Sequence, residues 1–290
     1  MAQQYRVEQR TKLLPFLFKA LEGWSKKTVK QRLQGSSVAV NGTVTTKHDF
    51  MLNEDDVVEV GVVQNKSRAS TAVRKLEIIY QDRDIVAINK PAGLLSVGSS
   101  KENKEHALAL LRLQLTRGKE RVQLWPVHRL DRDTSGILLF ATSKEVREAV
   151  MDRWESTEKI YLAVVEGKPK EQQKTITEPL RLDEEEYFVH VGKHPNAKKA
   201  ITHYKVLENK ENCSLLEVKI DTGRQHQIRA HMNWIGHSIV GDERYGKKPF
   251  KKNTERMGLH ALRLSIVHPV SKKPLTFEVD APRDFYGLLK

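Results

Sequence analysis

The chain has 290 residues, 39% hydrophobic and 30% charged, and its 50 Lys and Arg against 37 Asp and Glu give a formal net charge of +13 and a pI near 9.6. This length favours two domains, and this composition is typical of a globular protein with a sizeable core. The positive surplus favours a polyanionic partner. Nucleic acid ranks above a membrane because no lipid anchor or basic amphipathic stretch flanks an apolar segment. No apolar stretch approaches the roughly 20 residues that span a bilayer.

The amino-terminal residues and the single cysteine indicate a reducing compartment. The first residues lack the apolar core of a signal peptide. Cys213 cannot form an internal disulfide, and its apolar neighbours predict a buried strand position. We therefore expect a cytoplasmic protein that works as a monomer.

A small α/β domain is predicted for residues 11–62. Leucine and phenylalanine recur at helical spacing over residues 13–21, and Ser25 is a suitable N-cap for a second, short helix. The pair Asn41-Gly42 predicts a β-hairpin. A strand over 56–60 closes this domain.

The second predicted helix has a strongly basic outer face. Its cationic side chains are Lys26, Lys27, Lys30 and Arg32. Two helices and a hairpin with such a face resemble the S4-like RNA-binding domain, and the resemblance implies that these four side chains bind RNA. A solvated basic face on an ordinary small domain is the alternative. Residues 63–74 are small and polar without periodicity, which predicts a flexible linker.

Residues 75–290 are predicted to form a larger α+β domain. Strands are expected at 76–80, 85–89, 137–141, 158–167 and 198–204, and helices at 104–116, 143–155 and 225–234. Many strands follow one another without an intervening helix. The sheet should therefore be mixed and mainly antiparallel.

The most informative segment of this domain is 126–136, Pro-Val-His-Arg-Leu-Asp-Arg-Asp-Thr-Ser-Gly. It places Asp131 between Arg129 and Arg132 on a polar turn, directly before a predicted strand. A carboxylate beside cations should stay ionised and can act as a nucleophile or a base. A surface aspartate in an ordinary salt bridge is the alternative. The second carboxylate, Asp133, suggests a paired-carboxylate glycosidase, but residues two apart on an extended turn point to different sides.

Three other stretches carry candidate functional side chains. Residues 89–93, Asn-Lys-Pro-Ala-Gly, follow a strand, and Lys90 could contact phosphate there. Tyr161 lies within the predicted strand at 158–167. Residues 222–231, Thr-Gly-Arg-Gln-His-Gln-Ile-Arg-Ala-His, read as a turn and a basic helix start. Its two histidines lie five residues apart, off one helical face, and no cysteine or carboxylate cluster joins them, so we expect no metal.

Together these strings resemble the RluA family of RNA pseudouridine synthases, whose signature HRLDRxTSG matches residues 128–136. The resemblance covers about residues 76–280. It implies that Asp131 is the catalytic carboxylate, that Tyr161 packs on the target base, and that Arg229 orients Asp131 through a bidentate pair. The remaining matches would contact the substrate RNA, and they are Arg129, Arg132, Lys90, Arg224, His226 and Leu259. Arg224 and His226 would contact the RNA backbone or, alternatively, structure the helix start. Leu259 would make its contact by packing against the flipped base.

The resemblance implies an enzyme that isomerises uridine to pseudouridine in structured RNA, either large-subunit ribosomal RNA or transfer RNA. Substrate and product are isomers, so no cofactor is expected, and the chain lacks a P-loop or a dinucleotide fingerprint. The target base should be flipped out of its stack. Asp131 would either attack the sugar or remove a proton from C2′. Two alternatives are a non-catalytic RNA-binding or ribosome-assembly protein of the same fold, and a methyltransferase, which the absence of a Gly-rich cofactor loop disfavours.

Overall fold

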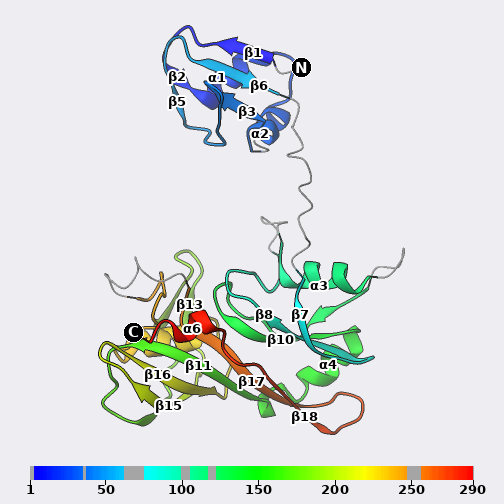
Figure 1. The fold of residues 1–290 in the computed structure, drawn as a ribbon, viewed down its shortest axis with the longest axis vertical. Coiled ribbons are helices and arrows are strands. Elements are labelled where there is room, and N and C mark those ends of the chain that lie inside the picture. Colours follow the sequence, from blue (N-terminus) through cyan, green and yellow to red (C-terminus); the bar gives the residue numbers. More distant parts are fainter. Residues whose placement is uncertain are drawn as a thin grey trace. The chain divides into compact units, whose positions relative to one another are not determined.

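The computed structural model describes residues 3–34, 37–61, 75–98, 105–116, 122–246 and 256–289. The chain divides into two compact units, residues 1–73 and 74–290 (Figure 1). The predicted linker at 63–74 lies outside the described residues. Within the described ranges, no helix has the length and apolar character of a membrane span.

The first unit combines short strands with two helices. Its strands are β1 (Gln3–Arg6), β2 (Thr11–Lys12), β3 (Val38–Val40), β4 (Thr43–Val44), β5 (Met51–Leu52) and β6 (Val57–Val60), and its helices are α1 (Leu13–Ala20) and α2 (Lys26–Gln34). Four strands form a sheet in the order β1-β6-β3-β4, and β2 pairs with β5. Ser25 caps α2 by accepting a hydrogen bond from the backbone N–H of Thr28 at 3.1 Å. Apolar residues of both helices pack with the buried valines of β3 and β6 in one core.

Strand β1 lies before the predicted start of the small domain at residue 11. It pairs antiparallel with β6 over its four residues. Its residues are Gln-Gln-Tyr-Arg and are mostly exposed. No apolar alternation marks the strand, which explains why the sequence pattern missed it.

The second unit is built on one ten-stranded sheet, whose curvature Figure 1 shows. Its strands are β7 (Glu77–Gln81), β8 (Ile85–Lys90), β9 (Trp125–Pro126), β10 (Ser135–Ala141), β11 (Glu158–Glu166), β12 (Gln173–Ile176), β15 (Thr202–Asn209), β16 (Cys213–Ile220), β17 (Leu259–Val267) and β18 (Pro274–Glu278). The order is β12-β15-β16-β11-β17-β10-β8-β7, with β18 beside β17 and β9 beside β10. Among the described strands, β10 and β17 are the parallel pair and the others pair antiparallel. The predicted mixed, mainly antiparallel α+β sheet is confirmed.

Helices cover both faces of this sheet. They are α3 (Ala107–Leu115), α4 (Lys144–Met151), the 3-10 turn η1 (Trp154–Ser156), α5 (Gln227–Trp234) and α6 (Arg283–Tyr286). Side chains of β17 point to both faces of the sheet and pack with different helices. Leu259 and Ala261 join the cores that contain α5 and α3, whereas Leu262 and Leu264 join those that contain α6 and α4.

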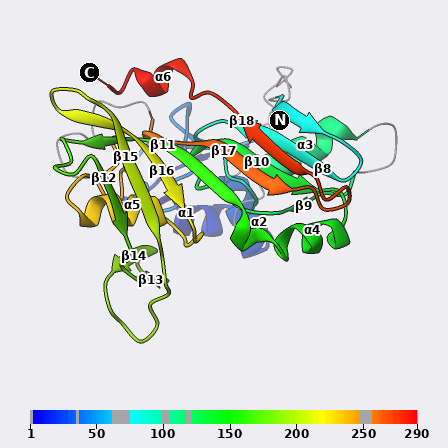
Figure 2. The same cartoon turned by 90° about the horizontal axis from the view of Figure 1, so that it is seen from below.

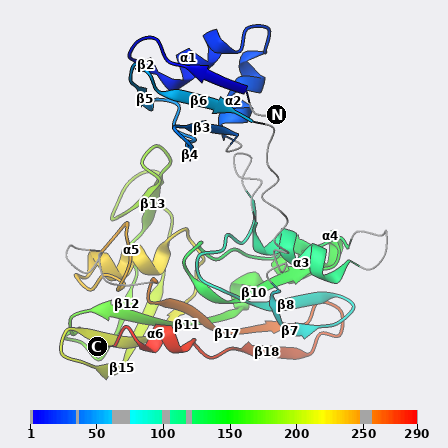
Figure 3. The same ribbon diagram turned by 45° about the horizontal axis from the view of Figure 1, so that its top comes forward.

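Two predicted elements differ from the structure. The helix expected at 143–155 is divided into α4 and η1, and the strand expected at 198–204 begins only at Thr202. Lys198 instead makes an isolated bridge with Leu180. Leu180 begins the hairpin of β13 (Leu180–Asp183) and β14 (Phe188–Val191), which projects from the sheet (Figures 2 and 3).

The junction of β10 with β17 fixes the start of β10. Gly136 has φ +109°, and a Cβ there would lie 2.2 Å from the carbonyl oxygen of Ala261, so only glycine fits this close approach. The neighbouring Ser135 hydroxyl lies 2.8 Å from His260 Nδ1 and accepts a hydrogen bond from Arg256 at 2.5 Å. The loop at 129–134, which leads into β10, therefore ends at a rigid point.

Candidate active site

Two buried polar side chains, Lys90 and Ser96, fix the backbone of the loop at 129–134 by hydrogen bonds. The Lys90 ammonium is fully buried and donates hydrogen bonds to the carbonyl oxygens of Pro91, Leu94 and Arg132 at 3.0, 2.7 and 3.0 Å. Ser96 Oγ donates to the Leu130 carbonyl at 2.7 Å and accepts from its N–H at 3.0 Å. The prediction that Lys90 contacts phosphate is wrong, because a fully buried ammonium that ties these carbonyls together cannot reach RNA.

Arg229, on α5, links two carboxylates. Its Nη1 donates to Asp131 Oδ2 at 2.8 Å, and its Nε and Nη2 donate to Asp242 Oδ2 and Oδ1 at 2.7 and 2.9 Å. The predicted partnership of Arg229 with Asp131 is present, but the bidentate pair is formed with Asp242 and only one bond reaches Asp131. No role was predicted for Asp242.

The Arg229–Asp242 pair is ionised despite its burial. Burial alone would raise the pKa of Asp242, but Arg229 and the backbone N–H groups of Tyr245 and Arg244 hold this pKa below its usual value. Burial would likewise lower the pKa of Arg229, but Asp242 and then Asp131 raise it. The aromatic ring of Tyr245 covers the guanidinium, whose carbon lies 5.1 Å from the ring centroid. Asp242 therefore fixes the Arg229 guanidinium, which donates its remaining Nη1 to Asp131.

Asp131 keeps one carboxylate oxygen available. Its side chain is 26% exposed, and Oδ2 accepts the bond from Arg229. Oδ1 accepts no hydrogen bond from the described residues, and its near neighbour is His226 Nε2 at 3.8 Å. An oriented carboxylate with one free oxygen can attack an electrophilic carbon or remove a proton.

His226 lies at the N-cap of α5, in the left-handed conformation with φ +50°. It is buried, and its Nδ1 lies 3.0 Å from the Tyr245 hydroxyl. Burial lowers the pKa of His226, although the charge of Asp131 opposes this effect. His226 makes no side-chain capping hydrogen bond at the start of α5 and lines the cleft close to Asp131, so both roles predicted for it stay predictions.

Asp131 lines a cleft of about 1580 Å³, larger than the pockets of roughly 300–1,000 Å³ that hold small molecules. Its cationic lining comprises Arg129, Arg132, Arg147, Lys159, Arg224, Arg229, Arg244 and Arg256, and its carboxylates are Asp131, Asp133, Glu243 and Asp284. Cations outnumber carboxylates eight to four. The cleft therefore suits a large, anionic substrate.

The cleft brings together most of the predicted substrate contacts. Tyr161 lines it from β11, and burial followed by the charge of Asp131 raises the pKa of this tyrosine. Tyr161 therefore keeps its proton beside the carboxylate. Arg129, Arg132 and Arg224 line the cleft with exposed side chains.

Leu259 does not line this cleft. It is 4% exposed and packs in the core beneath α5. The prediction that Leu259 contacts the base is therefore wrong for this structure, because the residue points into the layer between β17 and α5. Apolar lining comes instead from Ile220 and Met257.

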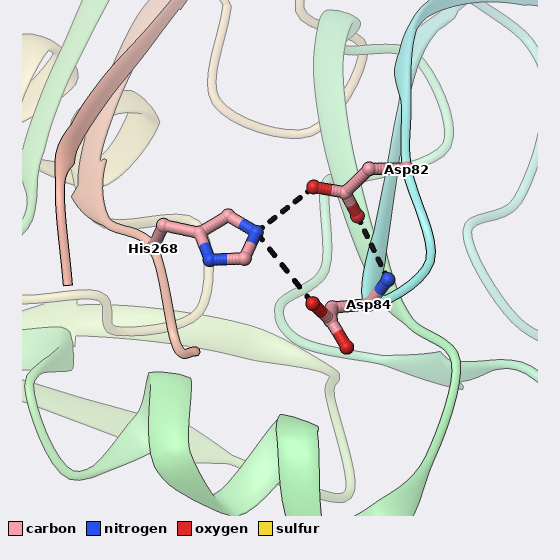
Figure 4. Close-up of side chains that lie close together, drawn as sticks. All are labelled: Asp82, Asp84 and His268. Carbon is pink, nitrogen blue, oxygen red and sulfur yellow. Dashed lines mark hydrogen bonds and ion pairs between the residues drawn. The ribbon is translucent and has the colours of Figure 1, made fainter. Parts of the chain in front are cut away.

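A second convergence of carboxylates and histidine joins two turns of the same unit (Figure 4). His268 Nδ1 accepts from the backbone N–H groups of Val270 and Ser271 at 3.2 and 3.0 Å. Its Nε2 must therefore carry the proton, which it donates to Asp82 Oδ2 at 2.9 Å. Asp82 Oδ1 accepts from the N–H groups of Asp84 and Ile85, both at 2.8 Å. These residues could present ligand atoms to a metal, but in this arrangement they act as a hydrogen-bonded clasp.

Comparisons with known proteins agree with this geometry. A family model described as RNA pseudouridylate synthase matches residues 84–234. Ribosomal large subunit pseudouridine synthase C of Vibrio cholerae is 34% identical, covering 92% of this chain and 88% of its own length. The tRNA pseudouridine synthase C of Pectobacterium carotovorum is 38% identical, covering 71% and 60%. The solved structure of human RNA Pseudouridylate Synthase Domain Containing 1 has a TM-score of 0.62 at 25% identity, covering 72% of this chain and 85% of that one.

The matched segment contains the cleft residues Asp131, Tyr161 and Arg229. The family match, the relatives and the shared fold all agree with the RluA-type resemblance of the sequence. The chain belongs to the RNA pseudouridylate synthase family and is an RNA pseudouridine synthase.

Proposed function

We propose that this enzyme isomerises specific uridines in structured RNA with Asp131 as its catalytic carboxylate. The observation that carries the proposal is the asymmetry of Asp131, whose Oδ2 is held by Arg229 while its Oδ1 stays unbonded among the described residues of a cation-lined cleft. In the reaction the N1–C1′ bond of uridine breaks and a C5–C1′ bond forms. The C5 proton is lost and N1 gains a proton, so atoms and charge balance. Asp131 attacks C1′ or removes the C2′ proton.

We propose large-subunit ribosomal RNA as the substrate class, with transfer RNA as the second candidate. The relative named for the ribosomal large subunit aligns with 92% of this chain, including most of the first unit. The relative named for transfer RNA aligns with only 71%. Ribosomal large subunit pseudouridine synthase D of Zymomonas mobilis is a further relative, 31% identical over 74% of this chain, and the recurrence of this name supports the first substrate class.

The experiment maps pseudouridines by carbodiimide-dependent primer-extension stops in total RNA from cells with and without the gene. We expect at least one stop in large-subunit ribosomal RNA to disappear without the gene. A stop that disappears only from transfer RNA would transfer the proposal to that substrate. An unchanged map would leave the non-catalytic RNA-binding alternative as the better account.

We propose that residues 1–73 form an S4-like domain that binds the RNA backbone. Lys26, Lys27 and Lys30 are exposed on α2 and are free to meet phosphate. Arg32 is less available, because its guanidinium lies 5.4 Å from the ring centroid of Trp24 and its Nη1 donates to the Gly61 carbonyl at 3.4 Å. The three lysines are therefore the primary phosphate-binding groups of this domain.

The test replaces all three lysines by glutamine in the full-length chain. For each lysine that neutralises a phosphate, the replacement should reduce the slope of log affinity against log salt by about 0.7 to 0.9. Single-turnover chemistry at saturating RNA should be unchanged, since the second unit contains the entire cleft. Replacement of Lys168, Lys170 and Lys210 in the other unit is a charge-matched control. An unchanged slope in the α2 variant would contradict RNA binding by this helix.

We further propose that the enzyme acts as a cytoplasmic monomer and needs neither metal nor cofactor. An isomerisation transfers no electrons and consumes no nucleotide, so the reaction itself requires no cofactor. Treatment with EDTA, once RNA folding has been controlled for, should leave the rate unchanged. A loss of rate that zinc restores would contradict this proposal.

A further inference from the structure

Tyr187 is an aromatic side chain with no role in the proposed chemistry. It ends the turn between β13 and β14, on the hairpin that projects from the sheet (Figure 3). The residue lines the cleft and is 49% exposed. Its hydroxyl makes no hydrogen bond within the described part of the chain. A large ring presented to a cationic cleft in this way is suited to contact a flat ligand group.

The backbone at Tyr187 is held in an unfavourable conformation. Its φ of +51° lies in the left-handed region, which a tyrosine rarely adopts. Arg244 Nη1 donates to the carbonyl oxygens of Glu186 and Tyr187 at 3.1 and 2.8 Å. Asp183 Oδ1 accepts from the N–H groups of Glu185 and Glu186 at 3.1 and 3.2 Å. Such a conformation persists only where several surrounding contacts hold it in place. These hydrogen bonds therefore fix the position of the Tyr187 ring.

The Tyr187 ring is supported on its protein side by two groups. The guanidinium carbon of Arg244 lies 5.3 Å from the ring centroid. The imidazole of His226 meets the ring at 84° with 5.7 Å between centroids. These contacts fix the ring while about half of its surface stays open.

The same two supports connect Tyr187 to the catalytic carboxylate. The backbone N–H of Arg244 donates to Asp242 Oδ1 at 2.9 Å, and Asp242 forms the bidentate pair with Arg229, which holds Asp131. His226 reaches within 3.8 Å of Asp131 Oδ1. The ring and the carboxylate are therefore positioned by one continuous set of contacts.

We propose that Tyr187 is a stacking platform for the RNA base next to the uridine that is isomerised, an inference that rests on the proposed function. Removing the target base from its stack leaves its neighbour without a partner on one side. An aromatic ring supplies a replacement for any of the four bases, because each has a π face. Stacking of this kind contributes roughly 1–3 kcal/mol per base, which corresponds to about 5- to 150-fold in affinity. Tyr187 should therefore act on RNA binding and leave chemistry at saturation largely unchanged.

The experiment uses the full-length enzyme and a synthetic RNA hairpin that contains the mapped uridine. In two versions 2-aminopurine replaces the base on the 5′ or the 3′ side of that uridine, and an Asp131→Asn background prevents turnover during titration. We expect the fluorescence of one version to fall on binding to the parent and to Tyr187→Phe. Tyr187→Leu should lose this quenching and bind at least about fivefold more weakly. Tyr286→Leu, which alters an exposed tyrosine on α6 that does not line the cleft, is the matched control.

The outcomes separate stacking from other roles. Equal affinity and quenching for the parent and Tyr187→Leu would overturn the proposal, and so would a loss in Tyr187→Phe, which would assign the effect to the hydroxyl. Should Tyr187→Leu not fold, Tyr187→Trp must retain quenching and bind at least as tightly as the parent. Failure of the parent Asp131 enzyme to convert the unlabelled hairpin would instead reject the proposed function.

Discussion

The cleft and the clasp of the second unit both bring carboxylates and basic side chains together, and they differ in which carboxylate oxygens remain available. In the cleft, Asp131 has one oxygen bonded to Arg229 and one oxygen that accepts no hydrogen bond from the described residues. In the clasp of Figure 4, Asp82 uses Oδ1 for two backbone N–H groups and Oδ2 for the Tyr80 hydroxyl and His268.

This comparison shows that convergence of charged groups does not by itself make a reactive site. In the clasp both oxygens of Asp82 accept hydrogen bonds from nearby groups, so Asp82 contributes to stability and has no free oxygen to act as a base. The cleft instead fixes a carboxylate with a single bond and leaves the second oxygen facing a large cationic cavity. Substitutions in the cleft should therefore lower activity, whereas substitutions in the clasp should lower stability.

The largest expected effect is on activity and comes from Asp131→Asn. An amide of the same shape can neither attack the sugar nor remove a proton, so single-turnover rates should fall by at least about 10³-fold. RNA affinity should change by less than threefold. Asp133→Asn, two residues along the loop and paired with exposed Arg132, is the matched control and should stay within threefold of the parent. A residual rate within tenfold for Asp131→Asn would remove Asp131 from the mechanism.

The next effect is expected from Asp242→Asn, which acts through Arg229. The substitution leaves the guanidinium without its bidentate partner, and breaking a buried pair in this way typically costs about 3–5 kcal/mol. We expect this loss in the free energy of unfolding by urea titration. We also expect a fall in rate of roughly 10–100-fold, because the orientation of Asp131 is relaxed. A folded variant with a normal rate would show that Asp131 does not depend on this pair.

A substitution in the clasp should lower the free energy of unfolding and leave the rate nearly unchanged. Asp82→Asn replaces one acceptor oxygen with an NH₂ group, which would face N–H or O–H groups that now donate to Asp82. We therefore expect the free energy of unfolding to fall by about 1–3 kcal/mol. The single-turnover rate should stay within threefold, because Asp82 does not line the cleft. A large loss of rate in a folded Asp82→Asn protein would show that the two arrangements are coupled.

The smallest effect concerns pH and His128. Burial, followed by the charge of Lys159, lowers the pKa of His128 to about 4. The unfolded chain therefore binds a proton near pH 6.5 that the folded chain does not bind until about pH 4, and stability falls as the pH drops through this window. His128→Gln can still accept the hydrogen bond from Leu139 N–H. Between pH 7 and pH 5 the free energy of unfolding should fall in the parent and in His128→Gln, but the fall in the variant should be smaller by roughly 1–2 kcal/mol. An identical dependence of the unfolding free energy on pH in the two proteins would contradict a half-buried His128 that is neutral in the folded chain.

The sequence predicted those parts of the fold that a local pattern specifies. The apolar run of β10 and the alternation in β11 mark buried strands, and the strings around Asp131 and Arg229 predicted that these two side chains meet. Tyr161 was also predicted beside them. The strand patterns depend on residue type and spacing within one element, whereas the meeting of Asp131, Tyr161 and Arg229 was implied by the resemblance to the RluA family.

The remaining features depend on contacts between distant segments. Lysine is usually a surface residue, but the ammonium of Lys90 is enclosed by carbonyl oxygens of two loops. Asp242 became the principal partner of Arg229 only because the turn at 241–246 folds under α5. Tyr187 lies in a polar turn with no apolar pattern, so its position at the cleft had no local signal.

The most direct test of the central claim is complementation of the gene deletion, read by the pseudouridine map. Cells without the gene receive the parent, Asp131→Asn or Asp82→Asn protein, each at equal abundance by immunoblot. We predict that the parent and Asp82→Asn restore the missing carbodiimide-dependent stop and that Asp131→Asn does not. Restoration of the stop by Asp131→Asn would contradict the claim that this carboxylate performs the isomerisation.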